Sequence, residues 1–170
     1  MVFFEAENYL FFLRRMRETL LPLVSVIAYC LMPTHYHLLV RVRETPKSPA
    51  PCSACSSPTP KPINKRFDRV GALFQSAFQA KPVTSYAHLL TLCAYIHANP
   101  VKNGLTRQPE DWLYSNYLEW LGQRKGTLVD REFIREHFEP PEAYRAFMAD
   151  YLATRRLPEE VAKYLQTLEE

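Results

Sequence analysis

Residues 26–42 have the sequence VIAYCLMPTHYHLLVRV, in which two apolar, β-prone runs flank a short turn. The pattern predicts strands over 23–31 and 36–43, joined at Met32-Pro33-Thr34. Because this connection is too short for a crossover, we expect the two strands to pair antiparallel.

His35 and His37 lie where the second predicted strand begins. Side chains at positions i and i+2 of an extended chain point to the same side, so both imidazoles can reach one metal ion while Tyr36 faces the core. Most His-x-His pairs in isolation are structural or surface residues, and the pair alone leaves that interpretation open.

Helical periodicity predicts one helix over residues 6–20 and another over 84–98. Thr84 or Ser85 is expected to cap the start of the second helix, which should end before Pro100. Its predicted buried stripe consists of Leu89, Leu92, Cys93 and Ile96.

Tyr95 and Asn99 stand four residues apart near the end of the second helix, and such residues share a helix face. A phenol beside a divalent ion or basic groups can attack a phosphate, and an amide oxygen beside two histidines can complete a site for Mg²⁺ or Mn²⁺. The alternative is that Tyr95 packs in the core and Asn99 caps the helix. His97, about 200° away from Tyr95 around the helix, is expected to pack or to contact phosphate.

The middle of the chain is basic and interrupted by prolines. Residues 44–62 hold six of the fourteen prolines and predict a mobile loop, and a short strand is expected over 73–80. Residues 61–107 carry seven Lys or Arg against the single acid Asp68, whereas residues 108–170 carry eight basic and thirteen acidic side chains. This distribution favours a polyanion-binding surface, although ordinary surface charge also fits it.

The chain lacks the features of a membrane or secreted protein. It has no run of eighteen apolar residues and no basic, apolar and small-residue signal at its start, so we expect a cytoplasmic protein without membrane partners. Cys30 and Cys93 lie in apolar segments and are expected to be small core residues.

The blocks LMPTHYHLLV, GALFQSAFQAKPV and AYIHANPVKNGL, followed by PEDWLYSNYLEWLG, resemble the single-tyrosine HUH transposases, and within them the REP-associated tyrosine transposases. The resemblance implies an α+β fold of the HUH type, RRM-like and ferredoxin-related, with flanking helices around a central antiparallel sheet. It implies a transposase domain over 1–122, including the loop at 44–62, and a helical tail over 123–170. From Ser115 onward, several short helices are expected, separated by Gly122, Gly126, Pro140-Pro141 and Pro158.

The resemblance also implies a reaction. His35 and His37 match the family's metal ligands, Tyr95 matches the nucleophile, and Asn99 matches the polar ligand one helical turn later. The expected activity cleaves and rejoins single-stranded or hairpin DNA through a 5′-phosphotyrosine intermediate, with Mg²⁺ or Mn²⁺ and without a nucleotide cofactor. Phosphate contacts are expected from the basic residues Lys65, Arg66, Arg69, Lys81 and Lys102. Stacking faces for unpaired bases are expected among Phe67, Phe74, Phe78 and Tyr86. Family relatives include dimers as well as monomers, so a homodimer is one expected assembly.

Two departures from the family favour an alternative. Relatives usually have a further strand, of the kind YH-x-x-x-RG, before the segment with which this chain begins, and a helix where residues 44–62 are rich in proline. Loss of a strand is expected to leave a neighbouring sheet edge uncovered. The alternative function is therefore a truncated, catalytically inactive remnant that binds DNA hairpins.

Two other interpretations use different residues. Cys52 and Cys55 stand in a P-C-x-x-C segment similar to that of zinc nucleobase deaminases, but His37 occupies the position where their H-x-E motif requires glutamate. A structural zinc site formed by both cysteines with His35 and His37 is a further alternative. A generic RNA-binding sheet would need paired aromatic motifs on adjacent strands, which the sequence does not show.

Overall fold

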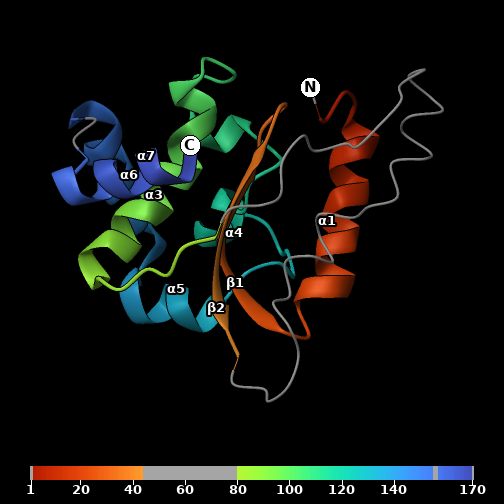
Figure 1. The fold of residues 1–170 in the computed structure, drawn as a ribbon, viewed down its shortest axis with the longest axis horizontal. Coiled ribbons are helices and arrows are strands. Elements are labelled where there is room, and N and C mark those ends of the chain that lie inside the picture. Colours follow the sequence, from red (N-terminus) through yellow and green to blue (C-terminus); the bar gives the residue numbers. More distant parts are fainter. Residues whose placement is uncertain (1, 44–79, 155–156, 170) are drawn as a thin grey trace.

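The computed structural model describes residues 2–43, 80–154 and 157–169 (Figure 1). The elements in chain order are α1 (Ala6–Leu20), β1 (Val24–Leu31), β2 (Tyr36–Val42), α3 (Tyr86–Lys102), the 3₁₀ helix η2 (Pro109–Asp111), α4 (Tyr117–Trp120), α5 (Arg131–His137), α6 (Pro141–Thr154) and α7 (Glu159–Glu169). The predicted loop over 44–62 and the predicted strand over 73–80, apart from Ala80, lie outside the described residues.

Over the described residues the fold is α+β, with a two-stranded antiparallel sheet placed between helices. Helix α1 covers one face of the sheet, and α3 covers the other together with the helices that follow it (Figure 1). The predicted first helix and the antiparallel strand pair are confirmed. Cys30 and Cys93 are fully buried, as expected of small core residues. Within the described ranges, no helix has both the length and the apolar composition needed to cross a bilayer.

An irregularity in β1 changes which side chains face each layer. The pairing with β2 shifts between Val26 and Ala28 and leaves Ile27 without a partner in the register. Such a bulge inserts one residue and reverses the alternation of side chains beyond it. Val24 and Val26 before the bulge therefore face α1 together with Tyr29 beyond it.

The side-chain amide of Asn116 bonds the backbone of β1 around this bulge. Its Oδ1 accepts a hydrogen bond from Tyr29 N at 2.8 Å, and its Nδ2 donates to Ile27 O at 2.9 Å and to Leu128 O at 3.4 Å. The Trp120 indole also donates to Ile27 O, at 3.1 Å. The outer edge of β1 is thus covered by the chain around Asn116, and Leu31 N donates to Tyr114 O at 2.9 Å. The expectation of an uncovered sheet edge therefore does not apply to this edge.

His97 joins this network from α3. Its Nε2 lies 2.9 Å from Asn116 Oδ1 and its Nδ1 lies 2.6 Å from the Tyr144 hydroxyl of α6. Because the Asn116 amide nitrogen already donates to two carbonyls, its oxygen is the acceptor, so His97 carries its proton on Nε2 and accepts at Nδ1. The expectation that His97 packs in the core is confirmed, since its side chain is fully buried.

Helix α3 runs further than the sequence predicted. The prediction that it ends before Pro100 is wrong, because the helix continues to Lys102 with Pro100 inside it. Proline disfavours a helical conformation in the residue before it. Burial of residues 92–100 on all sides overrides that preference, and the Asn99 amide donates to Tyr95 O at 2.9 Å within the same turn.

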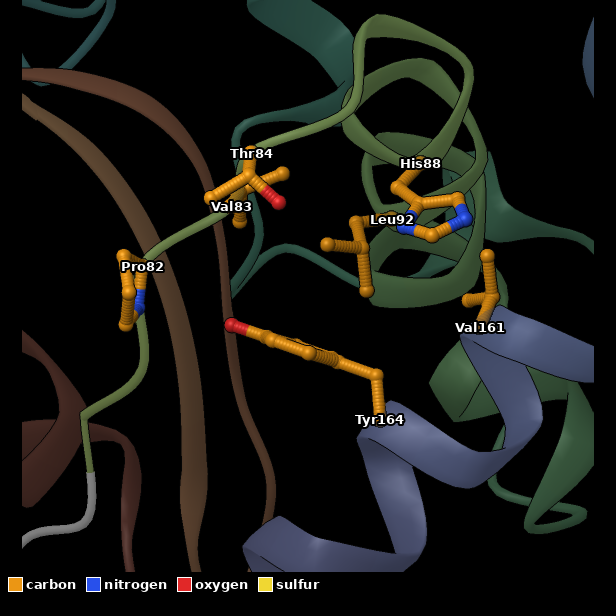
Figure 2. A pocket seen from close by; sticks show the side chains of 7 residues that line it. All are labelled: Pro82, Val83, Thr84, His88, Leu92, Val161 and Tyr164. Carbon is orange, nitrogen blue, oxygen red and sulfur yellow. The ribbon is translucent and has the colours of Figure 1, made fainter.

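The C-terminal helices belong to the same core as α3. Tyr144 and Met148 of α6 and Val161 of α7 are buried in the apolar cluster that contains the middle of α3. Figure 2 shows Tyr164 of α7 extending past Val83, and its hydroxyl donates to Lys81 O at 2.8 Å. The division of the chain at residue 122 stays a prediction, but the tail contributes to the main core.

Replacing Asn116 by Asp should destabilise the fold strongly. The carboxylate keeps the acceptor for Tyr29 N but loses the amide donors to Ile27 O and Leu128 O. Ile27 O keeps its bond from the Trp120 indole, so the main cost is the loss of these donors together with a charge in a buried site. We expect a loss of about 3–5 kcal/mol in the free energy of unfolding, measured by urea denaturation. Asn103→Asp, at the exposed end of α3, is the matched control and should cost less than about 1 kcal/mol. Equal losses in the two variants would refute this role of Asn116.

His97 should make stability depend on pH. Burial lowers the pKa of His97 to about 4, below its ordinary value of 6.5, although the hydrogen bond to Asn116 partly opposes this. Between about pH 6.5 and pH 4 the unfolded chain therefore binds a proton that the folded chain does not, so the free energy of unfolding falls as the pH falls through this window, by on the order of 3 kcal/mol. Imidazole ¹⁵N shifts should show a neutral, Nε2-protonated His97 down to about pH 4. The urea-unfolded chain is the control, in which His97 should titrate at about 6.5. A protonated His97 in the folded chain at pH 6 would contradict the prediction.

Candidate functional site

The turn between β1 and β2 places His35 and His37 on the face of the sheet that α3 covers. His37 pairs in register with Cys30, and Met32 N donates to His35 O at 2.8 Å to close the turn. The backbone N–H groups of Val2 and Phe3 both donate to Pro33 O, at 2.7 and 3.0 Å. The N-terminal segment therefore holds the turn that carries the histidines.

The two imidazoles approach each other through their Nε2 atoms, which lie 3.1 Å apart. Two nitrogen ligands at about 2.1 Å from one ion and this far apart would subtend an angle of about 95°, which fits an octahedral ion. His35 Nδ1 lies 2.9 Å from Thr34 Oγ1, a contact that fixes the orientation of the ring. An ordinary N–H···N hydrogen bond between the rings also accounts for the distance, so the arrangement permits a metal and does not require one.

His37 is neutral at physiological pH in this environment. Burial lowers its pKa to about 4, and the nearby His35 and Lys102 lower it further. A metal ligand must offer a lone pair, and a neutral imidazole offers one without losing a proton. His37 can therefore offer its lone pair to a metal ion without first losing a proton.

Tyr95 of α3 lies directly against His37. The two rings meet edge to face, with centroids 5.5 Å apart and planes at 79°. The Lys102 ammonium lies 4.4 Å from the centroid of the Tyr95 ring, a cation–π distance. The structure thus brings His35, His37, Tyr95 and Lys102 together from segments about sixty residues apart in the chain.

Asn99 follows Tyr95 by one helical turn, as predicted, and is 3% exposed. The hydrogen bonds of its side-chain amide stay within α3 and its C-cap. Nδ2 donates to Tyr95 O at 2.9 Å, and Oδ1 accepts from Asn103 Nδ2 at 3.4 Å. The proposed role of Asn99 as a metal ligand stays a prediction. Among the residues that the structure describes, no group of three His, Cys, Asp or Glu side chains is arranged to hold a metal ion. The histidine pair would therefore need oxygen ligands from Asn99, substrate or water.

The structure describes only some of the other predicted binding residues. Lys81 and Tyr86 are exposed, and Tyr86 stacks on His137 with ring centroids 5.4 Å apart. The remaining residues expected to contact phosphates, stack on bases or bind zinc lie outside the described residues: Lys65, Arg66, Arg69, Phe67, Phe74, Phe78, Cys52 and Cys55. Their roles stay predictions.

Sequence reasoning expected Lys102 to contact phosphates but did not place it over the Tyr95 ring. The two residues are seven positions apart, which puts them on one face of a helix two turns apart. This spacing was not used, because Pro100 was expected to end the helix before Lys102. The sequence also gave no indication that Asn116 anchors β1, because the hydrogen-bond partners of Asn116 are far away in the sequence.

No protein-family model, curated protein or solved structure matches this chain. The resemblance to HUH transposases therefore stays a prediction from the sequence motifs.

Mn²⁺ should bind first at His35 and His37. We expect substoichiometric Mn²⁺ to broaden the imidazole NMR signals of these two residues through paramagnetic relaxation, and to broaden them more strongly than the signal of His97, which lies farther from the ion. His35→Gln or His37→Gln should weaken Mn²⁺ binding by about tenfold or more. His88→Gln is the matched control, because His88 pairs with Glu160 on another part of the surface and should not affect the affinity. If the His88 signal broadened at a lower Mn²⁺ concentration than those of His35 and His37, the ion would bind outside the histidine pair.

Proposed function

We propose that this protein is a metal-dependent tyrosine DNA strand transferase of the single-tyrosine HUH kind. The observation that carries the proposal is the contact of the Tyr95 ring with His37, whose Nε2 lies 3.1 Å from that of His35. A phenol beside paired, partly neutral imidazoles combines a nucleophile with metal ligands in one site. The antiparallel strand pair with α3 across one face also supports the finer assignment to an HUH-type sheet.

His35 and His37 would hold the divalent ion through their Nε2 atoms. Asn99 is the candidate for a third protein ligand, and a bound phosphate would contribute further oxygens. When bound, Mg²⁺ or Mn²⁺ would draw electron density from the scissile phosphate and make its phosphorus more electrophilic. Thr34 would keep the His35 ring in position through its contact with Nδ1.

Tyr95 would act as the nucleophile. A bond forms between its phenolic oxygen and the phosphorus, and the bond from phosphorus to the 3′ oxygen breaks. The phenolic proton passes to solvent and the 3′ oxygen takes one up, which leaves a free 3′-hydroxyl and a 5′-phosphotyrosine. Because the phosphotyrosine conserves the energy of the phosphodiester, rejoining needs no nucleotide cofactor.

Lys102 would assist both the nucleophile and the substrate. Its ammonium lies over the Tyr95 ring, where a positive charge stabilises the phenolate relative to the phenol. The same side chain is exposed, and its charge would attract the phosphates of a bound strand. Single-stranded or hairpin DNA is the substrate that this arrangement and the basic middle of the chain favour.

The burial of Tyr95 favours a second candidate function. Its side chain is 7% exposed and belongs to the main apolar cluster. Tyr151 of α6 lies close enough that its pKa, raised to about 12 chiefly by burial, is raised further by Tyr95. A phosphate would reach the phenol only after these packed side chains move. A remnant that binds hairpins without turnover would not need that movement.

A covalent protein–DNA adduct is the expected signature of the enzyme. Incubation with a hairpin oligonucleotide that carries single-stranded flanks, in Mg²⁺ or Mn²⁺, should give an adduct that survives denaturing electrophoresis. Tyr95→Phe should abolish the adduct and keep hairpin binding, because only the phenolic oxygen is removed. His37→Gln should also lower the yield of adduct.

Tyr151→Phe is the matched control, since it removes a neighbouring buried hydroxyl and should leave adduct formation intact. Chelation of the metal should prevent the adduct in every variant. If the wild-type protein binds the hairpin but gives no adduct with either metal, the non-catalytic function is the correct one. An adduct that persists in Tyr95→Phe would refute the assignment of the nucleophile.

A further inference from the structure

A second concave site lies on the face of the sheet opposite the histidines. It is a groove of about 310 Å³ between α1 and the loop that includes Leu128, and we call it the α1 groove. Tyr29 of β1 lines it, and this residue packs in the cluster on the α1 side of the sheet. Its volume falls at the lower end of the range of small-molecule sites, which is about 300–1,000 Å³.

One stripe of α1 forms a wall of this groove. Leu10, Leu13, Arg14 and Arg17 follow the spacing i, i+3, i+4 and i+7, so they lie on one face of the helix. Arg14 and Arg17 are exposed, and neither has an acidic partner within the described part of the chain. Arg15, by contrast, is paired with Glu18 at 3.0 Å. The wall therefore presents leucine side chains beside two uncompensated guanidinium groups.

The hydroxyl of Tyr29 is available to a ligand in the α1 groove. Tyr29 is 3% exposed, yet its hydroxyl makes no hydrogen bond to any described residue. Thr106 Oγ1 is the one side-chain oxygen or nitrogen in the described ranges that is both sealed from solvent and unpartnered, so Tyr29 Oη is reached from outside. Burial raises the pKa of the Tyr29 hydroxyl, and the charge of Glu119, which also lines the groove, raises it further, so this hydroxyl lies near the groove. A buried phenol without a partner has hydrogen-bonding capacity left for a bound molecule.

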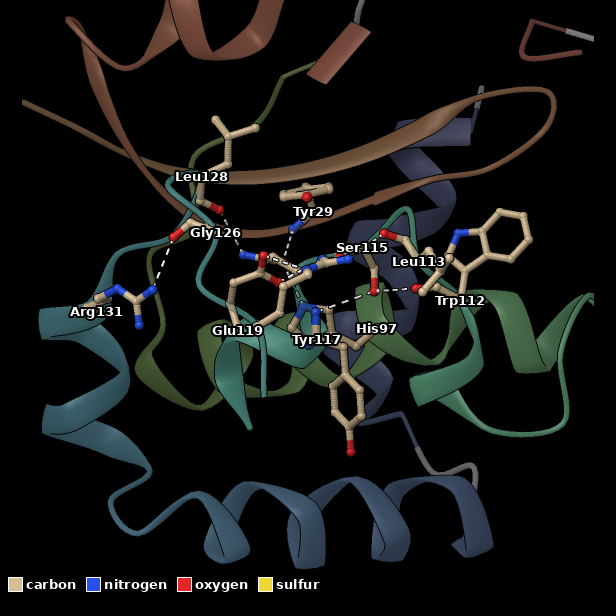
Figure 3. A network of polar contacts seen from close by, with 12 residues as sticks. Tyr29, His97, Trp112, Leu113, Ser115, Tyr117, Glu119, Gly126, Leu128 and Arg131 are labelled. Atoms are coloured by element: carbon tan, nitrogen blue, oxygen red, sulfur yellow. Dashed lines mark hydrogen bonds and ion pairs between the residues drawn. The ribbon is translucent and has the colours of Figure 1, made fainter. Parts of the chain in front are cut away.

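Glu119, the acidic residue of the groove, is already compensated. Arg124 pairs with both of its oxygens at 2.7 Å and also donates to the carbonyls of Leu113 and Ser115. Gly126 lies over this carboxylate, since a Cβ at that position would come within 2.0 Å of Glu119 Oε1 (Figure 3). The charge that remains in the groove is therefore the positive charge of Arg14 and Arg17.

We propose that the α1 groove binds a small amphipathic anion, a molecule with an aliphatic body and one carboxylate or phosphate group. The anionic group would pair with Arg14 and Arg17, whose guanidinium planes match either group through parallel hydrogen bonds. The aliphatic body would lie against the leucines, and an oxygen of the ligand would bond to Tyr29 Oη. This site is independent of the histidine–tyrosine site, because the sheet separates them.

Isothermal titration of the full chain with octanoate and with octyl phosphate tests the proposal. At least one should bind about tenfold or more tightly than octanol, which lacks the charge, and than inorganic phosphate, which lacks the aliphatic body. The double variant Arg14→Gln, Arg17→Gln should weaken that binding by about tenfold or more. Tyr29→Phe should weaken it by about three- to tenfold without lowering the thermal stability, because its hydroxyl has no internal bond to lose.

Arg15→Gln is the matched control on the same helix and should leave the affinity unchanged. Equal binding of octanol and the anions, or equal losses from Arg15→Gln and from the double variant, would overturn the proposal. It would also be overturned if hairpin DNA displaced the probe and lost affinity in the same double variant, since the groove would then belong to a nucleic-acid surface. If Tyr29→Phe left the affinity unchanged, the Tyr29 hydroxyl would have no role in binding the ligand.

Discussion

The side-chain amide of Asn116 holds the sheet, α3 and the C-terminal segment in one arrangement. Its four hydrogen bonds satisfy backbone groups around the bulge of β1 and fix the proton of His97 on Nε2. Buried polar groups are costly when unpaired, so each of these elements is tied to the others through one residue. Helix α3 therefore has a defined position across the sheet, and Tyr95 reaches His37 because of it.

Burial gives the candidate site its chemistry and also restricts it. The same low-polarity surroundings lower the pKa of His37 and keep its lone pair free for a metal at neutral pH. They also enclose Tyr95, whose ring is almost fully covered. An active enzyme of this kind has to open the packing around the phenol to admit a phosphate, whereas a binding protein does not. Formation of a covalent adduct with DNA therefore distinguishes the enzyme from the binding protein.

The bulge in β1 assigns different chemistry to the two faces of the sheet. Beyond it, Cys30 lies on the face of the histidines, and Tyr29 lies on the face of α1. One face joins a buried phenol, a half-buried and an exposed imidazole, and an exposed ammonium. The other carries the Tyr29 side chain beside Arg14 and Arg17 in an open groove. A single inserted residue sets this division, because it reverses the alternation of side chains along the strand.

Local periodicity in the sequence was enough to determine the first helix, the paired strands, their turn and the common side of His35 and His37. A period of two or of 3.6 residues is present in the chain whatever else it contacts. The continuation of α3 through Pro100, the position of Lys102 over Tyr95 and the anchoring by Asn116 were decided only by the tertiary structure. The bond from Asn116 to Tyr29 joins residues 87 positions apart, and the burial that keeps Pro100 helical comes from layers assembled out of distant segments. Such long-range packing leaves no periodic signal in the residues that it governs, and it outweighs their local preferences.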